Sequence, residues 1–202
     1  FDVMSLSMSN LGYNEESVSF PLIDLERQKD DLKSHEIYHK FYDEKYPNKK
    51  PLSLMLSGNY YLIKKILSQS SYEEIYMIGI SGGGWYTTFL SSIIPEIKTS
   101  YAFDGTYPLF FRLFWQNKGD WEHWGSKIYE KIDFWDLYVL STLDKFNKQN
   151  RKHFQVFNKW DRDYVALTMK GTSDSLGSPN FKVLLSDMSL HVIDPNFLFS
   201  QF

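Results

Sequence analysis

The chain has 202 residues, of which 43% are apolar and 18% aromatic, and it carries a net charge of −3 and no cysteine. This length and apolar content suffice for one sizeable hydrophobic core, so a single domain is expected. The charge provides no attraction to nucleic acid or to an anionic membrane surface, and the absence of cysteine excludes thiol catalysis, disulfides and thiolate metal sites.

The first part of the chain predicts one strand followed by helices. Residues 2–8 alternate apolar and polar side chains, which predicts a half-buried strand. Residues 26–50 are heavily charged and predict a largely helical segment, and residues 52–67 keep one face largely apolar, as an amphipathic helix does. No apolar stretch approaches the length of a membrane span. The start at Phe1 rather than methionine indicates a trimmed sequence, which leaves the compartment open.

A glycine-rich turn follows the apolar run at residues 75–78. Gly79-Ile80-Ser81-Gly82-Gly83 matches G-x-S-x-G, between a predicted strand and a segment predicted to be helical as far as Pro95. Such a turn projects a serine hydroxyl from a rigid framework toward a base, as a serine nucleophile requires. We expect Gly79 and Gly83 to remove side chains that would collide in the turn. We also expect the backbone N–H of Gly82 to face an anionic oxygen.

The second half predicts three further strands separated by helical and loop segments. Strands are expected at residues 99–105, 153–157 and 181–185. Residues 107–150 predict an aromatic-rich helical region, with one continuous helical stripe from Trp121 to Val139 after an Asp120 cap. Residues 165–179 predict a loop, and Asp194-Pro195 predicts the start of a short helix.

The alternation of strands and helices predicts an α/β fold with a mainly parallel sheet flanked by helices. Together with the G-x-S-x-G turn, the order of Ser81, Asp161 and His191 resembles the α/β-hydrolase superfamily over the whole chain. Asp161 comes just after the next-to-last predicted strand, and His191 just after the last. The resemblance implies a serine hydrolase that needs no cofactor and cleaves an ester or related acyl bond of a small molecule. Ser81 would attack, His191 would transfer the proton and Asp161 would orient the imidazole. Asp104, at the end of the strand after the turn, and Asp163 are alternative acids.

The chain departs from this superfamily at its beginning. The fold normally starts with further strands, and a loop after one of them supplies the second oxyanion donor, but no such loop precedes residues 2–8. The chain is therefore predicted to be the C-terminal portion of a longer domain, or its oxyanion hole is built differently. Loss of one donor typically lowers the rate by roughly 10²–10³-fold. The resemblance also implies a helical cap insertion at residues 107–150, where Phe110, Phe114 and Trp115 would line an apolar or sugar-stacking pocket.

Other functions remain open at this point. An acyltransferase or a serine peptidase would use the same triad. His35-Glu36-Ile37-Tyr38-His39 matches H-E-x-x-H, the signature of a zinc peptidase, but its charged flanks and missing third ligand favour a solvated helix without metal. A non-catalytic binding protein with a hydrolase fold is a further alternative. The sequence indicates no oligomeric state.

Overall fold

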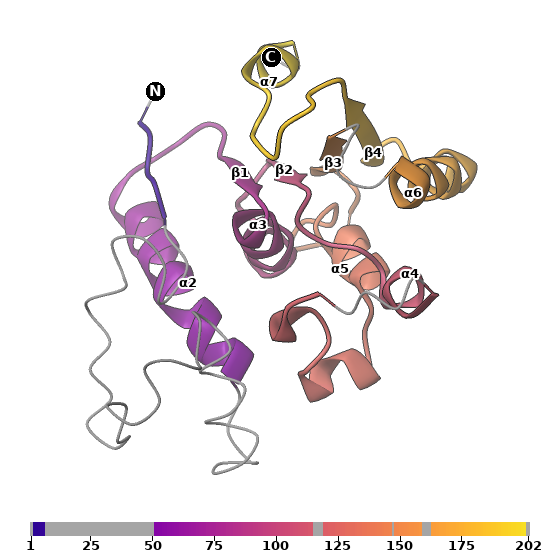
Figure 1. Cartoon of the computed structure of the whole chain (residues 1–202). Coiled ribbons are helices and arrows are strands. Elements are labelled where there is room, and N and C mark those ends of the chain that lie inside the picture. Colours follow the sequence, from indigo (N-terminus) through magenta and orange to yellow (C-terminus); the bar gives the residue numbers. More distant parts are fainter. Residues whose placement is uncertain (1, 7–50, 115–118, 147, 159–162, 201–202) are drawn as a thin grey trace, which may run out of the picture.

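The computed structural model describes residues 2–6, 51–114, 119–146, 148–158 and 163–200, and these residues contain a four-stranded parallel sheet (Figure 1). The strands are β1 (Tyr76–Ile80), β2 (Thr99–Phe103), β3 (Lys152–Asn158) and β4 (Phe181–Ser186), which lie side by side in this order. Each neighbouring pair is parallel. The prediction of an α/β fold with a mainly parallel sheet is therefore confirmed.

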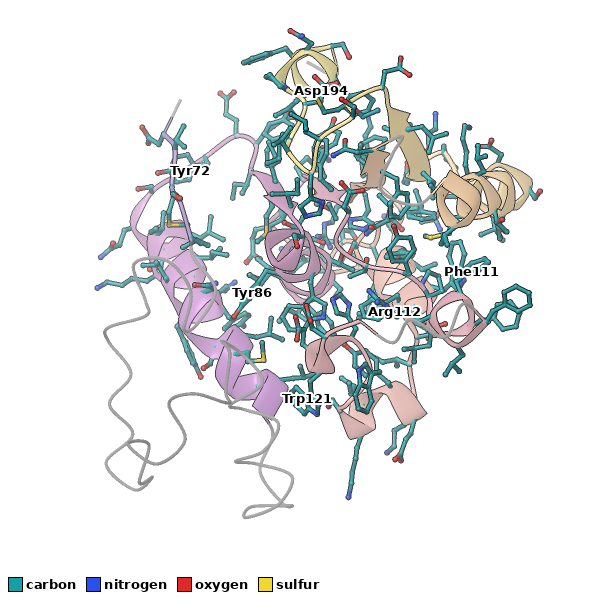
Figure 2. The ribbon with its side chains drawn as sticks, viewed as in Figure 1. Tyr72, Tyr86, Phe111, Arg112, Trp121 and Asp194 are labelled. Atoms are coloured by element: carbon teal, nitrogen blue, oxygen red, sulfur yellow. The ribbon has the colours of Figure 1, made fainter. Side chains whose placement is uncertain are left out.

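Helices connect the strands and cover both faces of the sheet. The helices are α2 (Pro51–Gln69), α3 (Gly82–Ile93), α4 (Leu109–Phe114), α5 (Phe134–Leu140), α6 (Asp163–Leu176) and α7 (Pro195–Phe199). Two short 3-10 helices, η4 (Trp121–His123) and η5 (Lys127–Glu130), lie between α4 and α5. Helix α7 lies on the opposite side of the sheet from α3 (Figure 1). Helix α2 packs beside α3, where the Tyr86 hydroxyl donates to the Met55 carbonyl oxygen at 2.8 Å (Figure 2).

Strand side chains alternate between two hydrophobic clusters. One cluster contains Tyr101, Phe103 and Val156 and is covered by residues of α7 and the loop before it. The larger cluster joins the other face to the helices, and its fully buried members include Trp85, Leu90, Phe134, Phe157 and Met169. Because both faces are covered, the central strands have few exposed positions, which is typical of a parallel sheet.

The segment predicted as a loop at residues 165–179 mostly forms helix α6, so that prediction is wrong. Its buried residues are Val165, Ala166, Met169 and Ser173, and their spacing of one, three and four matches one helical face. Polar residues and a glycine on the remaining faces concealed this pattern in the sequence. The helix ends before Gly177, whose positive φ of 62° is typical of a residue just after a helix.

The single helical stripe predicted from Trp121 to Val139 is also wrong, because η4, η5 and α5 divide this segment. Two polar side chains begin new helical turns within it. Ser126 accepts a hydrogen bond from the Ile128 N–H, and Asp133 forms a capping box with Asp136 at the start of α5. Asp120 occupies the N-cap position of η4, but its side chain makes no capping hydrogen bond.

Predictions for the two ends of the chain differ in outcome. The described part of the predicted first strand, residues 2–6, forms no strand. The charged segment at residues 26–50 lies outside the described residues. At the other end, Asp194 begins α7 as predicted, since its side chain accepts from the N–H groups of Asn196 and Phe197. Within the described part of the chain, no helix is both long enough and apolar enough to cross a membrane.

Candidate active site

Ser81 lies in a strained turn between β1 and α3. Its φ of 55° and ψ of −122° fall in a region that residues with a side chain rarely occupy. The Ser81 N–H donates to the Phe103 carbonyl oxygen at 2.9 Å, and its carbonyl oxygen accepts from the Trp85 N–H at 3.0 Å. These bonds hold the turn between the end of β2 and the first turn of α3. Ser81 is exposed, so its hydroxyl is accessible to a substrate.

Close backbone contacts explain some of the glycines in this turn. A Cβ atom at Gly79 would lie 2.2 Å from the Gly83 carbonyl oxygen, so the expected collision is real at Gly79. The same expectation is wrong for Gly83, where a Cβ atom would meet nothing within 4 Å. A second contact was not predicted: a Cβ atom at Gly84 would lie 2.7 Å from the Gly105 Cα atom. This contact brings the start of α3 directly against the turn that follows β2.

Asp104 and His191 lie close together at the C-terminal edge of the sheet. Asp104 directly follows β2 and has a positive φ of 45°, and His191 lies in the loop between β4 and α7. The distance from Asp104 Oδ2 to His191 Nδ1 is 3.8 Å; the carboxylate side chain is 4% exposed and the imidazole 49%. This distance is longer than a hydrogen bond. Catalytic hydrogen bonds are often long before a substrate binds, so the pair remains a candidate acid–base pair.

Ser81 shares one cavity with this pair. The cavity has a volume of about 120 Å³, and its wall on the sheet side contains Ser81, Gly82, Asp104 and His191. These residues come together because β1, β2 and β4 run in parallel, so the residues following them emerge at the same edge. Ligands of open parallel sheets generally bind at that edge.

A second part of the cavity wall comes from residues 107–123, between β2 and β3. It contains Tyr107, Arg112, Gly119, Asp120 and His123. The buried Arg112 side chain projects from α4 toward the middle of the molecule (Figure 2) and donates from Nη2 to His123 Nδ1 at 3.0 Å. Because a guanidinium only donates, Nδ1 is the acceptor, and a neutral His123 carries its proton on Nε2. This wall therefore provides N–H donors to the cavity that contains Ser81.

Several predicted site residues either lie outside the described residues or do not line this cavity. Asp161, Trp115 and the H-E-x-x-H residues His35, Glu36 and His39 lie outside the described residues, so the predictions for them stay predictions. Phe110 and Phe114 are 68% and 71% exposed on α4, and neither lines the cavity of Ser81. Arg112 from the same helix lines it instead. In the sequence, the only feature that distinguishes Arg112 is that it is the single charged residue of the otherwise apolar hexapeptide Leu-Phe-Phe-Arg-Leu-Phe.

One group of side chains has the composition of a metal site. Ligand atoms of Asp120, Glu122 and His123 lie within 4.8 Å of one another. However, His123 Nδ1 accepts a hydrogen bond from the Arg112 guanidinium, which brings a positive charge next to the group. That charge opposes the binding of a second cation, so these residues do not indicate a metal centre.

Comparison with known proteins assigns the chain to no family. A scan against protein-family models finds no match to the chain, and a search among curated proteins finds no similar sequence.

Proposed function

We propose that this chain is a serine hydrolase of the α/β-hydrolase type, which cleaves an ester or related acyl bond of a small molecule. One observation carries the proposal: Ser81, in a strained turn after a parallel strand, shares a cavity with the Asp104–His191 pair. Asp104 is the acid in this proposal because its carboxylate faces Nδ1 of His191. Asp161, predicted from its position in the sequence, is the alternative acid.

The first half of the reaction acylates the serine. Ser81 Oγ attacks the carbonyl carbon of the substrate while His191 Nε2 takes the hydroxyl proton. The Asp104 carboxylate at Nδ1 holds the required tautomer and stabilises the imidazolium. The Gly82 N–H, at the start of α3, donates to the oxyanion. The imidazolium then gives its proton to the leaving-group oxygen as the C–O bond breaks.

The second half releases the acyl group. His191 Nε2 takes a proton from a water molecule, whose oxygen attacks the acyl carbon. The bond from that carbon to Ser81 Oγ then breaks, and the proton on Nε2 returns to Oγ. The enzyme thus regains its starting protonation state and the carboxylic acid leaves. An acyltransferase would use an alcohol or amine in place of water at this stage.

The size and walls of the cavity support a small acyl group. A volume of about 120 Å³ is below the range of roughly 300–1,000 Å³ that is typical of ligand pockets. Residues of the 107–150 segment line the same cavity as Ser81, as residues of a helical cap would. We therefore assign this segment as the cap insertion of the proposed fold and expect preference for short-chain esters.

The proposal is tested with a fluorophosphonate probe, which forms a covalent bond to an activated serine. We expect the full-length protein to be labelled at Ser81 and the Ser81→Ala variant to remain unlabelled, as shown by mass spectrometry of the labelled peptide. Labelling of another serine, or none in folded protein, would contradict the proposed function. Ser178→Ala is a suitable matched control, because Ser178 lies outside the cavity, before β4.

A further inference from the structure

Asn158, the last residue of β3, makes hydrogen bonds toward both members of the acid–base pair. Its side-chain Nδ2 donates to the carbonyl oxygens of Leu190 and Val192, each at 2.9 Å. These two residues flank His191 in the chain. The backbone N–H of Asn158 donates to Asp104 Oδ1 at 3.1 Å. One buried residue of a central strand therefore holds the acid by its backbone and the histidine loop by its side chain.

The chemistry of the amide explains why asparagine occupies this position. Two carbonyl oxygens can only accept, so the group that faces them both must be the NH₂ end of the amide. Aspartate has the same shape but would present an oxygen to the two carbonyls. Leucine has a similar volume but no donor. The Asn158 Oδ1 atom is buried and has no hydrogen-bond partner within the described residues, which is unfavourable for stability. Stability alone therefore does not explain the residue.

Packing does little to orient the backbone around His191. Leu190 is 63% exposed and Val192 is 40% exposed. The ends of the loop are fastened where the Ser186 hydroxyl donates to Asp194 Oδ2 at 3.0 Å, at the start of α7 (Figure 2). Between these ends, the two bonds from the Asn158 side chain hold the residues on either side of the imidazole. The position of the imidazole therefore depends on this side chain more than on burial.

We propose that Asn158 is a positioning residue that sets the geometry between His191 and Asp104. It acts through the backbone of the histidine loop and does not touch the substrate. This inference rests on the proposed function, because it concerns the same acid–base pair. Since a misplacement of about 1 Å can lower a rate by roughly 10²-fold, the two side-chain bonds are expected to matter for catalysis.

Two variants test the inference in the full-length protein. Asn158→Asp keeps the shape and reverses the polarity toward the two carbonyls, and Asn158→Leu removes the donors at similar volume. Both leave the backbone N–H toward Asp104 in place. As a control, Ser141→Ala removes buried hydrogen bonds to Ser91 and Leu137 without altering a residue that lines the cavity.

We expect fluorophosphonate labelling of Ser81 to slow by roughly 10–100-fold in both Asn158 variants. With a short-chain aryl ester, kcat should fall while KM stays near its original value. The control should alter the thermal midpoint but neither the labelling rate nor kcat.

The possible outcomes separate the two proposals. If the original protein is not labelled at Ser81, the proposed function fails. If it is labelled, and the folded Asn158 variants react at the same rate as the original protein, the positioning role is overturned. A higher KM at an unchanged kcat also overturns it. If circular dichroism shows that neither variant folds, Asn158 is a structural residue and the positioning role is rejected.

Discussion

Asp104 is the residue for which the structure changes the interpretation most. The family resemblance assigns the acid to Asp161, two strands later than the serine. The structure brings Asp104 to 3.8 Å from His191 Nδ1, and its positive φ of 45° is a conformation that residues other than glycine rarely adopt. Strained residues of this kind often cluster at functional sites, and Ser81 is the second one among the described residues.

Substitution of the two candidate acids distinguishes between them. We expect Asp104→Asn to lower kcat/KM for a short-chain aryl ester by roughly 10³–10⁴-fold, because the neutral amide no longer stabilises the imidazolium or holds its tautomer. Asp161→Asn should retain nearly the original kcat/KM. Steady-state kinetics of both variants provide the measurement. The reverse pattern would transfer the role of the acid to Asp161.

At the scale of elements, α4 contributes to the walls of two cavities. Arg112 lines the cavity of about 120 Å³ around Ser81 and also a second cavity of about 330 Å³. The second cavity includes apolar side chains of Leu109, Leu113 and Trp124. The Arg112 guanidinium is held by His123 and lies 5.4 Å from the centre of the Tyr107 ring. This side chain therefore borders both the cavity of Ser81 and a second cavity with apolar walls.

Shortening Arg112 should change the preference for acyl chain length. We expect Arg112→Ala to raise the kcat/KM of an eight-carbon ester relative to a four-carbon ester by roughly 10-fold or more, because added methylene groups gain an apolar site. Arg112→Lys keeps a long cationic side chain and should retain the short-chain preference. A ratio that stays constant across both variants would show that the two cavities do not join.

For the whole molecule, a buried polar network between β2 and β3 affects stability. His153 is fully buried, and its Nδ1 lies 2.7 Å from Ser100 Oγ while its Nε2 lies 2.9 Å from Gln155 Nε2. The amide nitrogen of Gln155 donates, so Nε2 accepts and Nδ1 carries the proton. Burial, with a smaller effect from the Arg151 charge, lowers the pKa of His153 to about 3. The fold therefore requires the neutral imidazole.

The resulting pH dependence has a defined sign. The unfolded chain binds a proton at His153 below pH of about 6.5, whereas the folded protein does so only near pH 3. The contribution of the neutral His153 to the free energy of unfolding is therefore fully present above pH 6.5, and it is lost as the pH falls toward 3. Between pH 7 and pH 4 we expect His153 to account for a loss of roughly 3 kcal/mol in the free energy of unfolding. Urea titrations of the original protein and of His153→Gln at both pH values measure this difference. An equal loss in the two proteins would exclude His153 as its source.

The sequence alone determined the features that depend on local spacing. The alternation of apolar strands with helices predicted the parallel sheet, the G-x-S-x-G spacing predicted the turn at Ser81, and Asp194-Pro195 predicted the start of α7. Each of these follows from residues that are neighbours in the chain, whose backbone preferences and periodicity act before any tertiary contact forms.

Only the tertiary structure decided which distant residues meet. Asp104 and Asn158, separated by 54 positions, come together with the loop of His191 because three parallel strands end at one edge of the sheet. Helix α6 was not predicted from the sequence for a related reason. Its buried face is short, and it is defined by the sheet against which the helix packs. A side chain contributes to a site according to its place in space, and local sequence patterns carry little information about contacts that close such long loops.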